Sequence, residues 1–150
     1  MNEHVSDRTV KILLVDDNMV DQEAVRRAFV RHRIANPLLV AHDGVEALRV
    51  LRGVDEQNTG LHRPYIVLLD LNMPRMGGIE FLDHVRDDPK LRDIVVFVLT
   101  TSKSDEDKLA SYDHNIAGYI VKDDVGPGFQ RLVDLLQYYW RIVELPPERG

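Results

Sequence analysis

Short apolar runs alternate with amphipathic stretches from one end of the chain to the other. The apolar runs are continuous and span only about four to six residues, which is typical of strands buried on both faces of a sheet. Between them, apolar residues recur with helical spacing and charged residues occupy the other face, as around Ala24, Val25 and Ala28. The pattern predicts strands over residues 11–15, 38–41, 65–69, 94–99 and 117–121, and helices that begin near residues 20, 44, 77, 104 and 129.

Five strands that are each followed by a helix indicate an α/β fold, with one doubly wound parallel sheet covered by helices on both faces. Residues 53–64 are polar and rich in turn-forming residues, so we interpret them as a surface insertion. The sequence contains no internal repeat. We therefore expect a single domain over residues 1–150, with a core at about 11–142, a C-terminal tail at 143–150 and no output domain.

The residues that follow the strands carry candidate chemistry. In parallel sheets of this kind, ligands bind beyond the carboxyl ends of the strands. Four of the five predicted strands end in a reactive or charged residue, and these are Asp16 with Asp17, Asp70, Thr100 and Lys122. We expect these side chains to meet at one edge of the sheet.

Three clustered carboxylates repel one another unless a cation lies among them or one of them is protonated. Oxygen ligands without cysteine favour a hard ion, and Mg²⁺ fits best. Mg²⁺ readily shares its shell with a phosphate oxygen, and the remaining phosphoryl oxygens would then be bound by Lys122 and Thr100. The set predicts a phosphoryl-transfer site whose acceptor is a carboxylate.

Asp70 is the predicted acceptor. It stands alone after the central strand, and the tight loop that follows would present it openly. Asp16 and Asp17 are adjacent in the sequence and better suited to share a metal ion.

Two segments resemble the receiver domains of bacterial response regulators. The run VLLDLNMPRMGGIEFL resembles the family's phosphoacceptor segment, and LLVDDN resembles its acidic pair. The spacing from Asp70 to Thr100 and Lys122 also matches the family, and the resemblance extends over about residues 11–142. It implies a flavodoxin-like fold and a phosphoacceptor in two-component signalling. The partner would be a histidine kinase, and the protein would not be an enzyme beyond self-dephosphorylation.

The resemblance also implies how a metal ion would be held. Asp17 and Asp70 would ligate Mg²⁺ directly, together with the backbone carbonyl of Asn72. Asp16 would act mostly through metal-bound water.

The same resemblance implies how the site would respond to phosphorylation. Thr100 would hydrogen-bond the phosphoryl group and draw its loop inward, and Lys122 would pair with the phosphoryl oxygens. Tyr119 matches the aromatic residue whose ring turns inward when Thr100 moves. A strand aromatic that simply packs under a helix is an equally good interpretation of Tyr119.

The sequence departs from the family directly after Lys122. A proline with a cis peptide bond usually follows this lysine, but here Asp123 and Asp124 follow. A cis bond before a residue other than proline costs about 3 kcal/mol, so we expect a trans bond or a rearranged loop. This loop, the insertion, the Leu-Thr-Thr-Ser run and the long last helix resemble the receivers that partner bacterial phytochrome kinases.

The last predicted helix, from residue 129 to about 142, is apolar on more than one face. One stripe suits packing on the sheet, and a second stripe comprises Leu135, Tyr139 and Ile142. Such a helix needs more than one partner surface. Either residues 141–147 fold back over it, or it forms a symmetric homodimer, which we favour. The predicted dimer interface comprises Leu135, Tyr139, Trp140 and Ile142.

Composition excludes several other functions. The net charge of −6 and the pI of about 5.4 disfavour binding to nucleic acid or to an anionic membrane. The absence of cysteine excludes thiolate nucleophiles and zinc–thiolate sites. The sequence shows no secretory signal and no apolar run long enough to cross a bilayer. We therefore expect a cytoplasmic protein.

Four alternatives use the same fold or the same site. A Mg²⁺-dependent aspartyl phosphatase needs a second acid two residues after its nucleophile, where this chain has Asn72. A flavodoxin-like flavin binder needs a phosphate-binding loop after the first strand, where Asp16 and Asp17 would repel phosphate. A phosphorelay intermediate, or a degenerate receiver that acts only as a binding module, stays open, although the complete set of site residues disfavours the latter.

Overall fold

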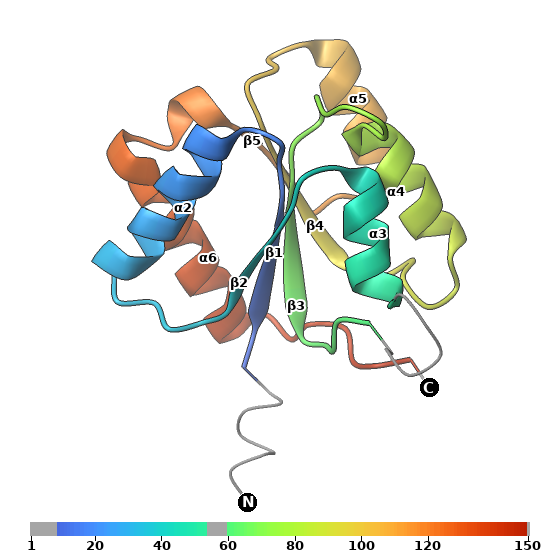
Figure 1. Cartoon of the computed structure of the whole chain (residues 1–150), viewed down its shortest axis with the longest axis horizontal. Helices are drawn as coiled ribbons and strands as arrows, with labels where there is room; N and C mark the ends of the chain where they lie inside the picture. The colour runs from blue at the N-terminus through green and yellow to red at the C-terminus, as the bar shows by residue number, and fades with distance from the viewer. Residues whose placement is uncertain (1–8, 54–59, 150) are drawn as a thin grey trace, which may run out of the picture.

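The computed structural model describes residues 9–53 and 60–149. In this part of the chain, five strands and five α-helices alternate as the apolar pattern predicted (Figure 1). Residues 54–59 of the predicted insertion lie outside the described part. The elements in chain order are β1 (Lys11–Val15), α2 (Met19–Arg31), β2 (Leu38–Ala41), α3 (Gly44–Arg52), β3 (Tyr65–Leu69), α4 (Gly78–Asp87), β4 (Val95–Thr100), α5 (Asp105–Asp113), β5 (Gly118–Val121), the 3-10 helices η1 (Lys122–Asp124) and η2 (Pro127–Phe129), and α6 (Gln130–Ile142).

The five strands form one parallel sheet in the order β2-β1-β3-β4-β5. This confirms the predicted flavodoxin-like, doubly wound fold. The strand order reverses between β1 and β3, where Val15 pairs with Leu69. A crevice opens beyond the carboxyl ends of the strands at such a switch point. Asp16 and Asp70 are therefore placed at the position where this fold binds ligands.

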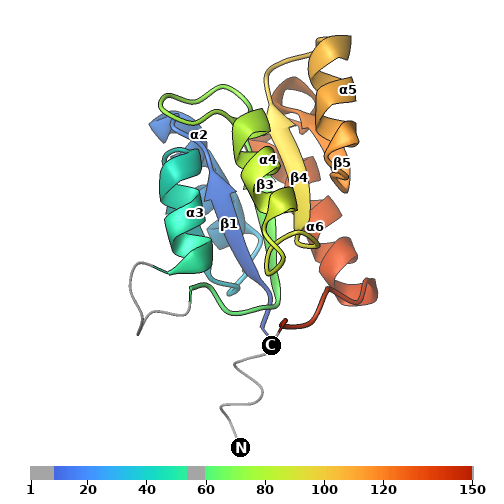
Figure 2. The same cartoon turned by 90° about the vertical axis from the view of Figure 1, so that its right-hand side faces the viewer.

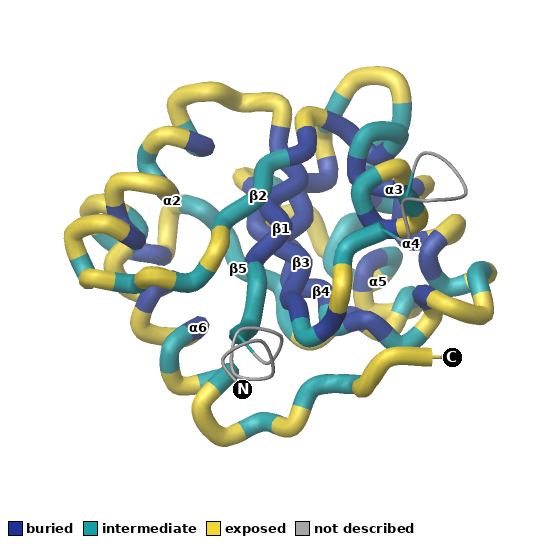
Figure 3. Tube along the Cα trace, turned by 60° about the horizontal axis from the view of Figure 1, so that its bottom comes forward, coloured by how far each residue is buried: buried dark blue, intermediate teal, exposed yellow. Residues whose placement is uncertain are grey.

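Helices cover both faces of the sheet. Helices α2 and α6 lie on one face, and α3, α4 and α5 lie on the other (Figures 1 and 2). Alternate residues of β1 serve the two layers, because Leu13 packs with the α3–α4 side and Leu14 with the α2–α6 side, and both are almost fully buried. The central strands β1 and β3 are buried, whereas the edge strands β2 and β5 are partly covered (Figure 3).

Side-chain caps start the helices near the site. Asn18 accepts a hydrogen bond from the backbone N–H of Asp21 at the start of α2, and Ser104 does the same for α5. Helix α4 starts without a side-chain cap, and its first residue, Gly78, lies against the strand end. A Cβ at Gly78 would lie 2.7 Å from the carbonyl oxygen of Asp70, so only glycine fits there.

Helix α6 packs on the sheet through Leu132, Val133 and Leu136, as predicted. Tyr139 also belongs to the core side, because its ring meets Phe97 edge-on at a centroid distance of 5.0 Å. Trp140 is partly buried on the same core. Of the four residues predicted for a dimer interface, Leu135 and Ile142 are the exposed ones, at 40% and 80%.

The C-terminal tail crosses the amino end of the sheet, opposite the acidic residues. Leu145 packs on the core beside α6, and the guanidinium of Arg63, just before β3, donates a hydrogen bond to the carbonyl oxygen of Pro147 at 2.9 Å. The tail therefore leaves Leu135 and Ile142 uncovered. No helix in the described ranges is long and apolar enough to span a membrane.

Candidate functional site

The three predicted carboxylates meet at the carboxyl end of the sheet. Asp16 and Asp17 follow β1 and Asp70 follows β3, and one carboxylate oxygen from each lies within 4.8 Å of the others. The backbone N–H of Asp70 donates to the carbonyl of Val15 at 2.9 Å, which extends the β1–β3 pairing into the site. Asp16 and Asp70 are buried, and Asp17 is exposed.

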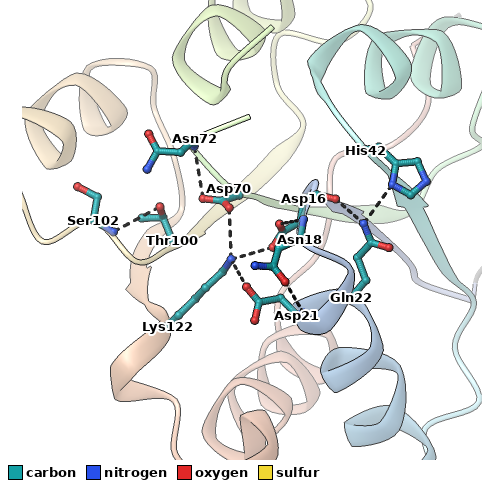
Figure 4. Close-up of polar contacts among 10 residues, drawn as sticks. All are labelled: Asp16, Asn18, Asp21, Gln22, His42, Asp70, Asn72, Thr100, Ser102 and Lys122. Atoms are coloured by element: carbon teal, nitrogen blue, oxygen red, sulfur yellow. Dashed lines mark hydrogen bonds and ion pairs between the residues drawn. The ribbon is translucent and has the colours of Figure 1, made fainter. Parts of the chain in front are cut away.

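Lys122 enters this cluster from the start of η1, directly after β5 (Figure 4). Its ammonium Nζ lies 2.7 Å from Asp21, 2.8 Å from Asp16 and 3.3 Å from Asp70, and its side chain is only 8% exposed. Burial by itself lowers the pKa of Lys122, but the hydrogen bonds with Asp16 and Asp21 outweigh it and raise this pKa. The lysine therefore stays cationic inside the site.

Asp16 is engaged on both of its oxygens. Oδ1 accepts a hydrogen bond from the backbone N–H of Asn18 at 2.8 Å, and Oδ2 accepts one from Lys122. Burial raises the pKa of Asp16, and the hydrogen bond from Lys122 opposes that shift. Both oxygens of Asp16 are thus held by protein donors, while Asp17 is exposed.

The other predicted site residues are Thr100, Asn72 and Tyr119. Thr100 is fully buried at the end of β4, and the backbone N–H of Ser102 approaches its Oγ1 at 3.5 Å. The backbone N–H of Asn72 lies 3.5 Å from Oδ1 of Asp70 (Figure 4). The Tyr119 hydroxyl donates to the carbonyl of Ser102 at 2.9 Å while its ring packs on the core. Tyr119 thus packs as a strand aromatic and also contacts the loop after Thr100.

The peptide bond after Lys122 is trans, one of the two outcomes predicted for a loop without the proline. Among the described residues, the one cis peptide bond is Arg63–Pro64, and Lys122–Asp124 instead form the 3-10 helix η1. The carboxylate of Asp123 lies 3.3 Å from the ammonium of Lys103, which belongs to the loop after β4. An exposed ion pair therefore joins the loops that follow β4 and β5.

Two residues of α2 that the sequence analysis did not single out also belong to the site. Asp21 binds Lys122, and the buried Gln22 donates from its side-chain amide to the backbone carbonyl of Asp16 at 2.7 Å. The same amide lies 3.1 Å from Nδ1 of His42, which follows β2. The only signal in the sequence is that Asp21 is a further acidic residue four positions after Asp17.

Comparisons with known proteins find one family and several relatives that match most of this chain. The profile of the response regulator receiver domain family matches residues 12–133. Response regulator Rcp1 of Synechocystis sp. is 33% identical over 136 residues, which are 90% of this chain and 92% of that protein. The matches therefore extend over most of this chain and nearly all of that relative.

Two solved structures are also similar over nearly their whole length. The crystal structure of the phosphorylated cyanobacterial phytochrome response regulator RcpA has a TM-score of 0.79 and 33% identity, and covers 93% of this chain and 99% of its own. The Mn²⁺-bound form of Rcp1 has a TM-score of 0.78 and 32% identity, and covers 92% and 99%.

Proposed function

The chain belongs to the response regulator receiver domain family of two-component signalling, and on that premise we propose that Asp70 accepts a phosphoryl group from a histidine kinase while Mg²⁺ is bound beside it. The observation that carries the proposal is the approach of Asp16, Asp17 and Asp70 within 4.8 Å, with the Lys122 ammonium beside them. The similarity to a phosphorylated relative supports it.

The donor set fits Mg²⁺. The cluster offers only oxygen ligands, and its closely spaced carboxylates need a cation to offset their repulsion. Asp17, Asp70 and the backbone carbonyl of Asn72 would hold the ion directly, with Asp16 acting through water. When bound, Mg²⁺ would neutralise carboxylate charge and polarise a phosphoryl oxygen. The Mn²⁺-bound structure of Rcp1 supports a divalent cation in such a site.

The transfer itself needs little from the chain beyond orientation and charge. An oxygen of the Asp70 carboxylate attacks the phosphorus of a kinase phosphohistidine and forms the new O–P bond. The P–N bond breaks, its electron pair remains on the imidazole nitrogen, and the ring recovers a proton from water. The ammonium of Lys122 and the hydroxyl of Thr100 donate hydrogen bonds to the phosphoryl oxygens.

The chain would act as a phosphoacceptor, not as a phosphatase. Asn72 stands where a phosphatase carries its second acid, and a carboxamide cannot protonate a leaving group. The only catalytic activity that we propose for the chain is hydrolysis of its own aspartyl phosphate. Because RcpA is a phytochrome response regulator, we propose a bacterial phytochrome kinase as the phosphodonor. The signal would pass on through protein contacts, with a homodimer as the signalling form.

The test is phosphorylation by a small donor. Incubation with acetyl phosphate and Mg²⁺ is expected to add one phosphoryl group, detected by intact mass, and Asp70→Asn is expected to add none. Asp17→Asn should retain Asp70 but require far more Mg²⁺ for the same adduct. An adduct that survives Asp70→Asn would overturn the assignment.

A further inference from the structure

Asp21 is the residue of the site that lies closest to Lys122. Its Oδ2 is 2.7 Å from Nζ, whereas Asp70, the proposed acceptor, is 3.3 Å away. Figure 4 shows the ammonium between the carboxylates of Asp16, Asp21 and Asp70, which come from three different elements or loops. Lys122 therefore lies closer to Asp21 than to the proposed acceptor, Asp70.

Asp21 is distinct from the carboxylates that could hold a metal ion. The cluster with oxygens within 4.8 Å of one another comprises Asp16, Asp17 and Asp70 among the residues described. Asp21 instead lies in the first turn of α2, where the side chain of Asn18 accepts its backbone N–H at 3.0 Å. This cap fixes the start of α2, and the Asp21 side chain there contacts Lys122.

All three N–H donors of the Lys122 ammonium have an acceptor in the structure. A lysine ammonium carries three N–H donors, and three carboxylates lie within hydrogen-bond distance of Nζ in Lys122. The hydrogen bond to Asp70 can pass to its phosphoryl group, but a second hydrogen bond to that group requires that Asp16 or Asp21 gives up its own.

Of Asp16 and Asp21, Asp21 is the partner that can be released more easily. Asp16 is 1% exposed, so loss of its hydrogen bond would leave a buried charge without its counter-ion. The side chain of Asp21 is 24% exposed and can be hydrated in place of the lysine. Its negative charge also opposes the approach of a phosphoryl dianion to Asp70.

We propose that Asp21 is a positioning residue that holds Lys122 in the unphosphorylated protein and competes with the phosphoryl group for its ammonium. Asp21 thereby sets how tightly the site takes up a phosphodonor. This inference rests on the proposed role of Asp70 as acceptor.

The test is Asp21→Asn, which keeps the shape of the side chain and removes its charge. With acetyl phosphate and Mg²⁺, the half-saturating donor concentration is expected to fall roughly three- to tenfold, the net contribution of one typical hydrogen bond, with a smaller change in the saturated rate. Asp21→Glu restores the charge, and its half-saturating concentration should return toward that of the wild type.

Glu23→Gln is the matched control. It removes the same charge from the same helix, but Glu23 pairs with Arg26 and does not contact Lys122. Its half-saturating concentration should equal that of the wild type. A second readout needs no phosphodonor or metal: the ¹⁵N resonance of the Lys122 ammonium should shift in Asp21→Asn and not in Glu23→Gln.

The outcomes separate this inference from the proposed function. If the wild type forms the Asp70 adduct and Asp21→Asn matches Glu23→Gln or binds the donor more weakly, the role of Asp21 is overturned alone. If the wild type forms no adduct at Asp70, the proposed function fails and the inference fails with it.

Discussion

Lys122 and Arg63 are charged residues whose side chains are largely buried, with exposed fractions of 8% and 5%. Arg63 donates to the carbonyls of Lys90 and Pro147 and to the carboxylate of Asp93. Burial of a charge is tolerated only where such partners offset the lost hydration. Among the described residues, accordingly, every buried side-chain polar atom has a hydrogen-bond partner.

Asp43 is a single residue with two structural tasks. It caps α3 by accepting the backbone N–H of Glu46, and its other oxygen accepts from Arg75 at 2.7 Å. Arg75 belongs to the loop after Asp70, so this pair joins that loop to α3. The hydrogen bond with Arg75 lowers the pKa of Asp43, despite the opposing effect of burial.

We predict that Asp43→Ala lowers the free energy of unfolding by about 1–3 kcal/mol, because a cap and a charged hydrogen bond are both lost. Urea unfolding followed by circular dichroism measures the change. Asp105→Ala is the control, since Asp105 is exposed at the start of α5 and makes only a long contact with Lys108. Equal stability of the two variants would contradict the prediction.

Helices α4 and α5 are joined by polar contacts around His114. Its Nε2 lies 2.5 Å from Asp83 of α4, and its Nδ1 lies 2.7 Å from the carbonyl of Ala110. Arg86 of α4 donates to the carbonyl of His114 at 2.6 Å. Both ring nitrogens therefore face acceptors, which favours the imidazolium form.

The pKa of His114 makes the contact between α4 and α5 testable by its dependence on pH. Burial alone lowers this pKa, but the hydrogen bonds with Ala110 and Asp83 outweigh it and raise the pKa above its ordinary value of 6.5. A raised pKa in the folded state means that the added stability is fully present below the ordinary value and is lost as the pH rises through the folded value.

We predict that His114→Gln destabilises the protein by up to about 1 kcal/mol near pH 6 and by less near pH 9. Paired urea unfolding curves of wild type and variant at the two pH values measure this difference. His84→Gln serves as the control, because His84 is half-exposed and lies 4.0 Å from Glu80. A stability difference that is independent of pH would contradict the role of His114.

At the scale of the whole molecule, the outer face of α6 is the surface on which the proposed homodimer would form. Leu135 and Ile142 are exposed there, together with Tyr138 at 68%. Tyr139 and Trp140 instead contact the core, so they would contribute less to a dimer interface than the exposed residues. The proposed homodimer therefore depends on fewer side chains than the apolar stripes of the sequence predicted.

We predict that Ile142→Asp shifts the protein from dimer to monomer in sedimentation velocity, because a charge would be buried between the two copies. Val30→Asp is the control, since Val30 is similarly exposed, at 78%, but lies on α2. A wild type that sediments as a monomer, or an unchanged Ile142→Asp dimer, would contradict the interface.

The sequence by itself determined the strands, the helices and the group Asp16, Asp17, Asp70 and Lys122. The pattern of apolar and polar residues is a local property of the chain, so strand bounds follow from it to about one residue. Parallel strands share their direction, so residues at their carboxyl ends must meet at one edge whichever strands are neighbours. For this reason a strand-by-strand interpretation was sufficient to assemble the predicted cluster.

Only the tertiary structure decided which side chains touch. The contact of Asp21 with Lys122 joins residues that are far apart in the chain, and so do those of Arg75 with Asp43 and of His114 with Asp83. Such contacts depend on the paths of loops and on how helices pack, which no local pattern specifies. Tyr139 follows the same rule, because its ring position on Phe97 is set by how α6 lies on the sheet. Lys122 was therefore predictable as a site residue, while its closest partner, Asp21, was not.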